Sequence, residues 1–156
     1  MSDVESTIFH NLTIRIAERS DLPAICRLYA QPNFDNGKIL ILNKAEQLFD
    51  RIQSYPNYHI YVAENSTDMV GTFALLIMDN LGHQGASSGV VEDLAVDPAW
   101  QGKGIGKAMM RFAMECCRKV GCYKITLSAN LKREHAHRFY ESLGFKKHGF
   151  SYMVEL

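Results

Sequence analysis

Residues 90–107 read VVEDLAVDPAWQGKGIGK, and this stretch decides the fold. The run 89–96 is apolar on both faces except for Glu92 and Asp93, which predicts a buried strand. The strand is expected to end where Asp97 and Pro98 follow.

A glycine-rich loop and a long helix follow that strand. The glycines stand at positions 102, 104 and 106, and apolar residues then recur at helical spacing over 104–120. Gly121 stands where a C-terminal cap belongs. The next strand-like segment, 123–129, should pair in parallel with 89–96 through a right-handed crossover.

The remaining pattern predicts further elements on both sides of this unit. In chain order they are a strand at 12–17, a helix capped by Ser20, a helix with a capping box at Asn43 and Glu46, strands at 58–64 and 69–77, a helix at 133–143 closed by Gly144, and a final strand within 146–156. A turn at 65–68 indicates an antiparallel hairpin. The order β-α-α-β-β-β-α-β-α-β predicts an α/β fold with a mixed central sheet flanked by helices.

Length and composition limit the class of protein. The chain has 156 residues, which suits a single domain, expected at 12–156 after an N-terminal extension at 1–11. Its formal net charge is zero, which disfavours a nucleic-acid binder. We expect no membrane segment, because no apolar run approaches 18 residues. The four cysteines form no CxxC pair and the start does not resemble a signal peptide, which predicts reduced thiols in a cytoplasmic protein.

The charge is unevenly distributed along the chain. Residues 1–100 carry 6 basic and 13 acidic side chains, whereas 101–156 carry 11 basic and 4 acidic ones. Such segregation favours an anion near the C-terminal third, although solvated helix faces of uneven sign would give the same count.

The glycine-rich loop itself indicates a phosphate ligand. Backbone N–H groups at the start of a helix attract a phosphate or pyrophosphate, and glycine lets the backbone approach it closely. The dinucleotide fingerprint fails because the glycines alternate as G-x-G-x-G. The nucleotide-triphosphate loop fails because Gln101 replaces its first glycine and Ala108 its hydroxyl residue.

The same segment resembles a known family. Residues 101–106, Gln-Gly-Lys-Gly-Ile-Gly, match the Q/R-x-x-G-x-G/A signature of the GNAT superfamily of acetyl-coenzyme-A-dependent N-acetyltransferases. Asn130 after the next strand, 136–140 (Ala-His-Arg-Phe-Tyr) and Gly144-Phe145 follow in the family's order. Residues 121–152 look most similar to the small-amine branch, which includes glucosamine-phosphate, aminoalkylphosphonate and certain aminoglycoside N-acetyltransferases.

The resemblance implies a cofactor site for acetyl-CoA, used as a cosubstrate. Strand 89–96 would splay from its parallel neighbour, leaving main-chain amides free for the pantetheine arm and the acetyl carbonyl, and the loop would hold the pyrophosphate. The residues so implied are Leu94, Ala95, Val96, Gln101, Gly102, Lys103, Gly104, Ile105, Gly106, Lys107 and Asn130. Lys132 and Arg133 could meet the 3′-phosphate or a phosphorylated substrate, or be an exposed basic pair.

Direct transfer to an amine needs a base and an acid. Glu92 is the predicted base, directly or through a water, with Asp93 as the fallback. Adjacent strand residues face opposite ways, so both can point into the site only if a bulge intervenes. Tyr140 matches the family's position for the acid that protonates the leaving thiolate, although its place on an apolar helix stripe would also suit a core residue.

The acceptor should be a primary amine of a small molecule, bound by the loops 31–42 and 79–88 with Tyr29, His59, His83 and Asp93 as lining residues. Acetylation of a protein or peptide, and a non-catalytic acetyl-CoA sensor, are the alternatives. No metal site is expected, because His135 and His137 lie on different faces of a helix. A C-terminal strand at 150–155 could join two copies into a homodimer, as recurs in the family.

Overall fold

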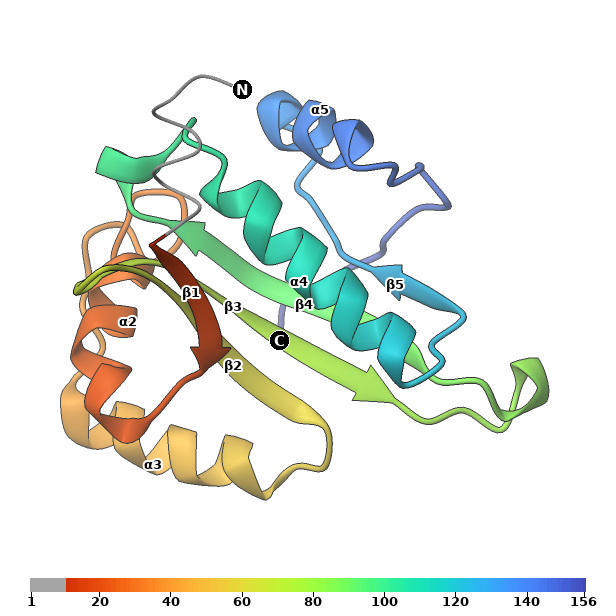
Figure 1. Cartoon of the computed structure of the whole chain (residues 1–156), viewed down its shortest axis with the longest axis horizontal. Helices are drawn as coiled ribbons and strands as arrows, with labels where there is room; N and C mark the ends of the chain where they lie inside the picture. The colour runs from red at the N-terminus through yellow and green to blue at the C-terminus, as the bar shows by residue number, and fades with distance from the viewer. Residues whose placement is uncertain (1–10) are drawn as a thin grey trace. The chain divides into compact units, whose positions relative to one another are not determined.

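The computed structural model describes residues 11–156, which divide into two compact units, 11–126 and Leu127–Leu156. Each unit is described by itself, and the predicted N-terminal extension lies almost wholly outside the described residues. The first unit holds a five-stranded sheet in the order β1-β2-β3-β4-β5 (Figure 1). Its strands are β1 (Leu12–Ile16), β2 (Tyr58–Asn65), β3 (Asp68–Met78), β4 (Ser88–Val96) and β5 (Lys124–Thr126). Neighbours from β1 to β4 are antiparallel and β4 pairs with β5 in parallel, which confirms the predicted mixed sheet.

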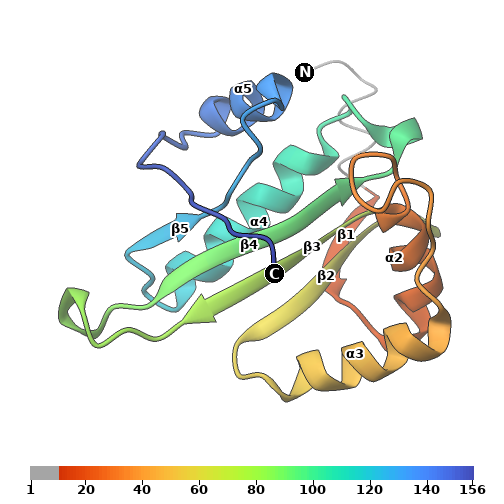
Figure 2. The same cartoon turned by 180° about the vertical axis from the view of Figure 1, so that it is seen from behind.

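Helices cover both faces of this sheet. They are α2 (Leu22–Tyr29), α3 (Leu42–Ser54) and α4 (Ile105–Lys119), with short 3₁₀ turns η1 (Arg19–Asp21), η2 (His83–Gly85) and η3 (Pro98–Trp100). Successive residues of β2 separate the two faces: the ring of Tyr61 meets Phe112 of α4, whereas Val62 packs with the residues of α2 and α3. Figure 2 shows α2 and α3 from the side opposite α4.

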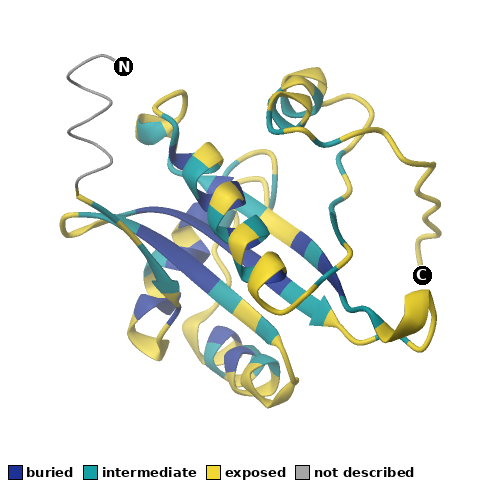
Figure 3. Cartoon of the chain, turned by 45° about the vertical axis from the view of Figure 1, so that its right-hand side comes forward, coloured by how far each residue is buried: buried dark blue, intermediate teal, exposed yellow. Residues whose placement is uncertain are grey.

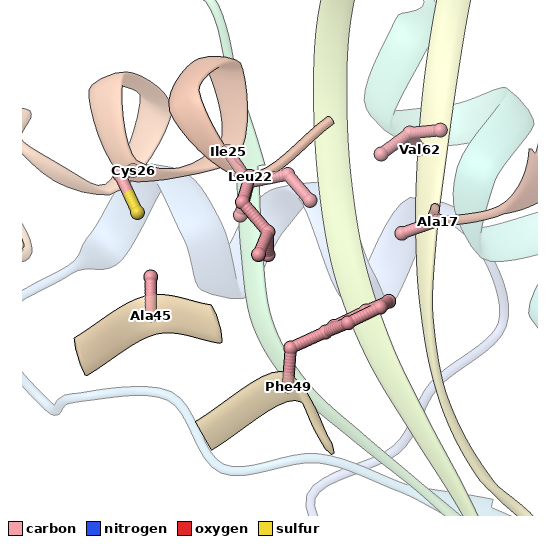
Figure 4. Packing of buried hydrophobic residues seen from close by; sticks show 7 residues of the cluster. All are labelled: Ala17, Leu22, Ile25, Cys26, Ala45, Phe49 and Val62. Carbon is pink, nitrogen blue, oxygen red and sulfur yellow. The ribbon is translucent and has the colours of Figure 1, made fainter. Parts of the chain in front are cut away.

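The α2–α3 face holds a small apolar core. It consists of Ala17, Leu22, Ile25, Cys26, Ala45, Phe49 and Val62, all at most 7% exposed. Figure 4 shows the side chain of Phe49 reaching from α3 across the space between helices and sheet. The recurrence of apolar residues at i, i+3 and i+4 in both helices produces this layer.

The α4 face also holds an apolar core. Phe73 and Leu75 of β3 are buried there, as are Met109 and Met110 of α4. Figure 3 shows buried residues gathered along the middle of the sheet and on the inner side of α4. Gly121 has φ of +78° just beyond this helix, and Cys122 N–H donates to the carbonyl of Cys117 at 2.9 Å, so the predicted glycine cap is confirmed.

The starts of the first two helices differ from the sequence prediction. Ser20 caps nothing, because η1 begins before it and Glu18 and Asp21 form the capping box instead. Asn43 lies inside α3, which begins at Leu42, and its side chain accepts a hydrogen bond from Gln47 at 2.8 Å. A side chain that is bonded within the helix cannot also cap its start, so the predicted caps at Ser20 and Asn43 were wrong.

The second unit contains α5 (Glu134–Ser142), and Gly144 with φ of +90° lies just beyond it, as predicted. The predicted final strand does not form: residues 146–156 carry no regular structure, and Phe150 and Tyr152 are exposed. A strand needs a partner to satisfy its N–H and C=O groups, and this unit supplies none among its described residues. In the described part of the chain no helix is long and apolar enough to cross a membrane.

Candidate active site

The parallel pair β4–β5 is short and then parts. Pairing covers only Ser88 to Val90 on β4 and Lys124 to Thr126 on β5. From Val91 to Val96, β4 therefore has no strand partner on its β5 side within this unit. Main-chain N–H and C=O groups along that edge are therefore free to bind a ligand. The predicted splaying of the parallel strand pair is confirmed.

The ladder with β3 shows which main-chain groups face the open edge. Asp97 N–H donates to the carbonyl of Val70 at 2.9 Å, so alternation turns the N–H and C=O of Val96 away from β3. Leu94 precedes Val96 by two residues and shares its direction, whereas alternation directs the N–H of Ala95 toward Thr72 of β3. The cofactor role predicted for Leu94 and Val96 thus has geometric support that Ala95 lacks.

A β-bulge interrupts β4 at the two predicted acidic residues. The register passes from Thr72 opposite Ala95 to Ala74 opposite Glu92, so Asp93 and Leu94 together oppose the single residue Phe73. Asp93 has φ of +53°, which is the left-handed conformation that this extra residue adopts. The bulge is the condition under which Glu92 and Asp93 can share one face.

The strand pairing places Glu92 on the α2–α3 face, and both Glu92 and Asp93 are exposed. Glu92 lies opposite Ala74 of β3, which in turn lies opposite Ile60 of β2, so the three side chains share one face of the sheet. Ile60 packs against the α2–α3 core. Burial raises the pKa of Glu92, and the charge of Asp93 raises it further. Burial raises the pKa of Tyr29, and the nearby charge of Asp93 raises it further. A base with a raised pKa accepts a proton more readily near neutral pH.

The loop after β4 leads into a helix start with no side-chain cap. Gly102 and Gly104 have φ of +73° and +85°, and Gly104 is the N-cap of α4. The first intrahelical bond runs from Ala108 N–H to the carbonyl of Gly104 at 3.0 Å. The N–H groups of Ile105, Gly106 and Lys107 precede it and have no intrahelical acceptor, so they form an anion-binding end.

Side-chain hydrogen bonds hold the point where this loop leaves β4. The carbonyl of Val96 accepts hydrogen bonds from Gln101 at 3.2 Å and from Gln31 at 3.1 Å, so the segment after α2 is tied to the end of β4. The ammonium of Lys103 lies 4.9 Å from the ring centroid of Trp100. Gln31 was not singled out from the sequence, because a glutamine in a polar loop carries no spacing signal.

The predicted acceptor-lining residues fall in three places. Tyr29 lies with Glu92 and Asp93 on the α2–α3 face. His59 lies on the α4 face, edge-on to Tyr61 at 6.2 Å. His83 stacks on Tyr123 at 4.3 Å, at the start of β4 and β5 rather than at the end from which the loop leaves. The structure therefore brings one of these three to the acidic pair.

A surface hollow of about 650 Å³ lies beside the loop but away from Glu92. Its walls are α2, the β2–β3 turn and η3, including Arg27, Asp68, Asp97 and Trp100. The bulge carboxylates do not line it. Within residues 11–156 no three His, Cys, Asp or Glu side chains are grouped so that they could hold a metal ion.

The second unit positions the other predicted residues. The side-chain oxygen of Asn130 accepts from Lys132 N–H at 2.9 Å, and its carbonyl accepts from Arg133 N–H at 2.9 Å, so Asn130 builds the turn into α5. Its amide nitrogen stays available as a donor toward a ligand. Lys132 and Arg133 are exposed.

The ring of Tyr140 packs against two phenylalanine rings of its own unit. Phe139 and Phe145 stand 5.1 and 5.9 Å from it. Burial raises the pKa of Tyr140, and the nearby positive charge of Arg133 opposes that shift. A phenol is protonated at neutral pH with or without this shift, so Tyr140 has a proton to donate, and the raised pKa makes it a weaker acid.

The family model for the acetyltransferase (GNAT) family matches residues 22–145, most of the chain. The chain belongs to the GNAT acetyltransferase family. The matched range of this GNAT chain contains β4, the glycine-rich loop, α4 and α5, the elements that carry its candidate site.

Two curated relatives of this GNAT chain act on small amines by name. A glucosamine 6-phosphate N-acetyltransferase of Trypanosoma brucei brucei is 39% identical over 80 residues, 51% of this chain and 52% of the relative. An aminoalkylphosphonate N-acetyltransferase of Salmonella typhimurium is 34% identical over 101 residues, 65% of each protein. The chain spans about half to two thirds of the length of the curated relatives it matches.

Solved GNAT structures share its fold over nearly the whole length. A putative acetyltransferase of Agrobacterium tumefaciens has a TM-score of 0.86 and 28% identity, covering 92% of this chain and 99% of that one. A glucosamine-6-phosphate N-acetyltransferase of Arabidopsis thaliana has a TM-score of 0.79 and 26% identity, covering 92% and 97%. The predicted GNAT fold is confirmed.

Proposed function

We propose that this chain uses acetyl-CoA to acetylate the primary amine of a small molecule by direct transfer. The observation that carries the proposal is one strand-loop-helix unit: β4 parts from β5 and runs into the uncapped start of α4. Membership of the GNAT family and the names of the small-amine relatives support it.

The residues of the first unit fit acetyl-CoA as a cosubstrate. The N–H groups of Ile105, Gly106 and Lys107 would hold its pyrophosphate, and the open-edge amides of Leu94 and Val96 would hold the pantetheine arm and the acetyl carbonyl. Bound acetyl-CoA supplies the thioester, whose C–S bond breaks as the amine nitrogen forms the new C–N bond.

Protons are assigned to two residues. Glu92 takes the proton that the attacking amine must lose, directly or through a water, and its raised pKa suits that role. Tyr140 gives a proton to the departing thiolate. The roles of Tyr140 and Asn130 and a homodimer rest on the resemblance, whereas a cytoplasmic location rests on the sequence pattern alone; all of these stay predictions.

A library screen with purified protein tests the proposal. Acetyl-CoA binding is measured by calorimetry, and free thiol release is followed with aminosugar phosphates, aminophosphonates, aminoglycosides, polyamines and peptides. The proposal requires turnover on a small amine. Turnover confined to peptides would identify a protein acetyltransferase, and binding without turnover on any amine would identify a sensor module; either result refutes the proposal.

The role of Glu92 is tested by a matched pair of variants. Glu92→Gln should lower kcat by roughly 10²–10⁴-fold, the usual contribution of a general base. Glu115→Gln on α4 is the control, since Glu115 forms only an exposed pair with Arg118. Equal activity of the two variants would remove the role assigned to Glu92.

A further inference from the structure

The carbonyl of Val96 accepts hydrogen bonds from two glutamine side chains. Gln31 reaches it at 3.1 Å and Gln101 at 3.2 Å, and the amide nitrogen of Gln101 also lies 3.4 Å from the side-chain oxygen of Gln31. A carbonyl oxygen has two lone pairs, so both are used. Because Val96 is the last residue of β4 and turns its main-chain groups to the open edge, these bonds hold the end of that edge.

The hydrogen bond from Gln31 is the better protected of the two. Gln31 is half-buried and its bond is partly shielded from water, whereas Gln101 and its bond are exposed. Water competes for an exposed hydrogen bond, so less of the strength of that bond remains. Gln31 is therefore the main side-chain restraint on the carbonyl of Val96.

The main chain around Gln31 joins this restraint to segment 31–42, the predicted acceptor loop. Gln31 follows α2, and its carbonyl accepts a hydrogen bond from Phe34 N–H at 3.0 Å. Gly37 N–H donates to the carbonyl of Ala30 at 2.7 Å, so the segment folds back on the end of α2. Among the described residues, Gln31 supplies the only side-chain hydrogen bond from this segment to β4.

We propose that Gln31 is a positioning residue, which aligns the end of β4 for acetyl-CoA and connects that site to the acceptor loop. This inference rests on the proposed function, in which the N–H groups of Leu94 and Val96 bind the pantetheine arm. A strand edge that is aligned for only part of the time binds its ligand more weakly, in proportion to that fraction. Ligand binding favours the hydrogen bond by the same factor, because linkage between two equilibria is reciprocal.

The first experiment separates the two parts of the cosubstrate. Calorimetry measures the Kd of Gln31→Met for acetyl-CoA and for adenosine 3′-phosphate 5′-diphosphate, which has the diphosphate but no pantetheine arm. Methionine keeps the length of the side chain and removes the hydrogen-bond donor. The Kd for acetyl-CoA should rise about fivefold, which is the usual net strength of one hydrogen bond. The Kd for the nucleotide should rise less than about twofold, because the N–H groups that start α4 bind the diphosphate without Gln31.

The matched control is Gln47→Met, since Gln47 is exposed on α3 and donates to Asn43 of its own helix. It should leave both Kd values unchanged. An unchanged Kd of Gln31→Met for acetyl-CoA would overturn the inference and leave the proposed function intact. An equal rise for both ligands, which a misfolded variant would also give, has the same consequence. A wild-type protein that binds no acetyl-CoA would overturn the proposed function as well.

A second experiment tests the connection to the acceptor loop. Lys38 is exposed within this loop, and tryptic cleavage after it is followed by mass spectrometry with and without saturating acetyl-CoA. Acetyl-CoA should slow this cleavage about fivefold in the wild type, the factor by which binding favours the hydrogen bond, and less than about twofold in Gln31→Met. Equal protection of the two proteins, or no protection of the wild type, would refute the connection through Gln31.

Discussion

Replacing Gly89 by alanine tests the packing between β4 and α4. A Cβ built on Gly89 would lie 2.3 Å from the sulfur of Cys117 and 3.5 Å from Cγ1 of Ile125. Non-bonded heavy atoms prefer a separation of about 3.5–4.0 Å, so more than about 1 Å must be recovered between the new methyl group and the sulfur. Cys117 is 3% exposed, and its neighbours leave the sulfur little room to move away.

The expected loss of stability follows from the cost of overpacking a core. One inserted methyl group of this kind destabilises a protein by about 1–3 kcal/mol. A loss of about 2 kcal/mol should lower Tm by roughly 4–8 °C for a chain of this size. Because the obstruction is a single sulfur atom, Gly89→Ala in a Cys117→Ala background should cost less than about 0.5 kcal/mol.

Urea unfolding of the four proteins in this cycle, followed by circular dichroism, measures the coupling. Gly82→Ala serves as a control, because Gly82 has φ of −67° and a Cβ there would meet nothing within 4 Å. It should be neutral or stabilise by up to about 1 kcal/mol. Equal losses from Gly89→Ala with and without the Cys117 sulfur would refute the packing argument.

Three further predictions concern charge, backbone and acid catalysis. Arg15→Met should lower the free energy of unfolding by about 3 kcal/mol, because it leaves Asp21 and Glu64 without their partner. The hydrogen bond from Arg15 lowers the pKa of Asp21, so the stability difference between variant and wild type should be complete above pH 3.8. It should shrink as the pH falls through the folded-state pKa, and urea unfolding at several pH values measures it. Gly104→Ala should destabilise the fold by roughly 1–2 kcal/mol, because its φ of +85° strains any side chain, and calorimetry should show weaker acetyl-CoA binding; unchanged affinity would count against the loop. Tyr140→Phe should lower kcat by roughly 10²-fold or more and remove the basic limb of the pH profile, whereas a retained basic limb would exclude Tyr140 as the acid.

Local signals predicted the elements around the candidate site well. The predicted ends of β4 and α4 agree with the structure to within one residue. Both elements could be predicted because the sequence shows a run that is apolar on both faces and then an apolar helical stripe. Gly121 and Gly144 ended their helices as expected, since glycine adopts positive φ without the strain that a side chain would cause.

Features that depend on distant partners were not visible. The sequence around Asp93 does not predict its left-handed conformation, because the bulge arises from the register between β4 and β3. Gln31 reaches the carbonyl of Val96 only through the fold of the segment that follows α2. The final strand was predicted from β-propensity alone, but a segment with high β-propensity forms a strand only where a neighbouring strand can pair with it.

The extra residue in β4 also affects how this chain should be aligned with others. A homologue without this extra residue would align with β4 from Leu94 onward only after a one-residue gap. If the gap were placed one position away, Glu92 would be aligned with a residue whose side chain points to the opposite face of the sheet. Equivalence of the proposed base across homologues is therefore decided by the backbone torsion at Asp93, which has φ of +53°, and not by which acidic letter shares its column.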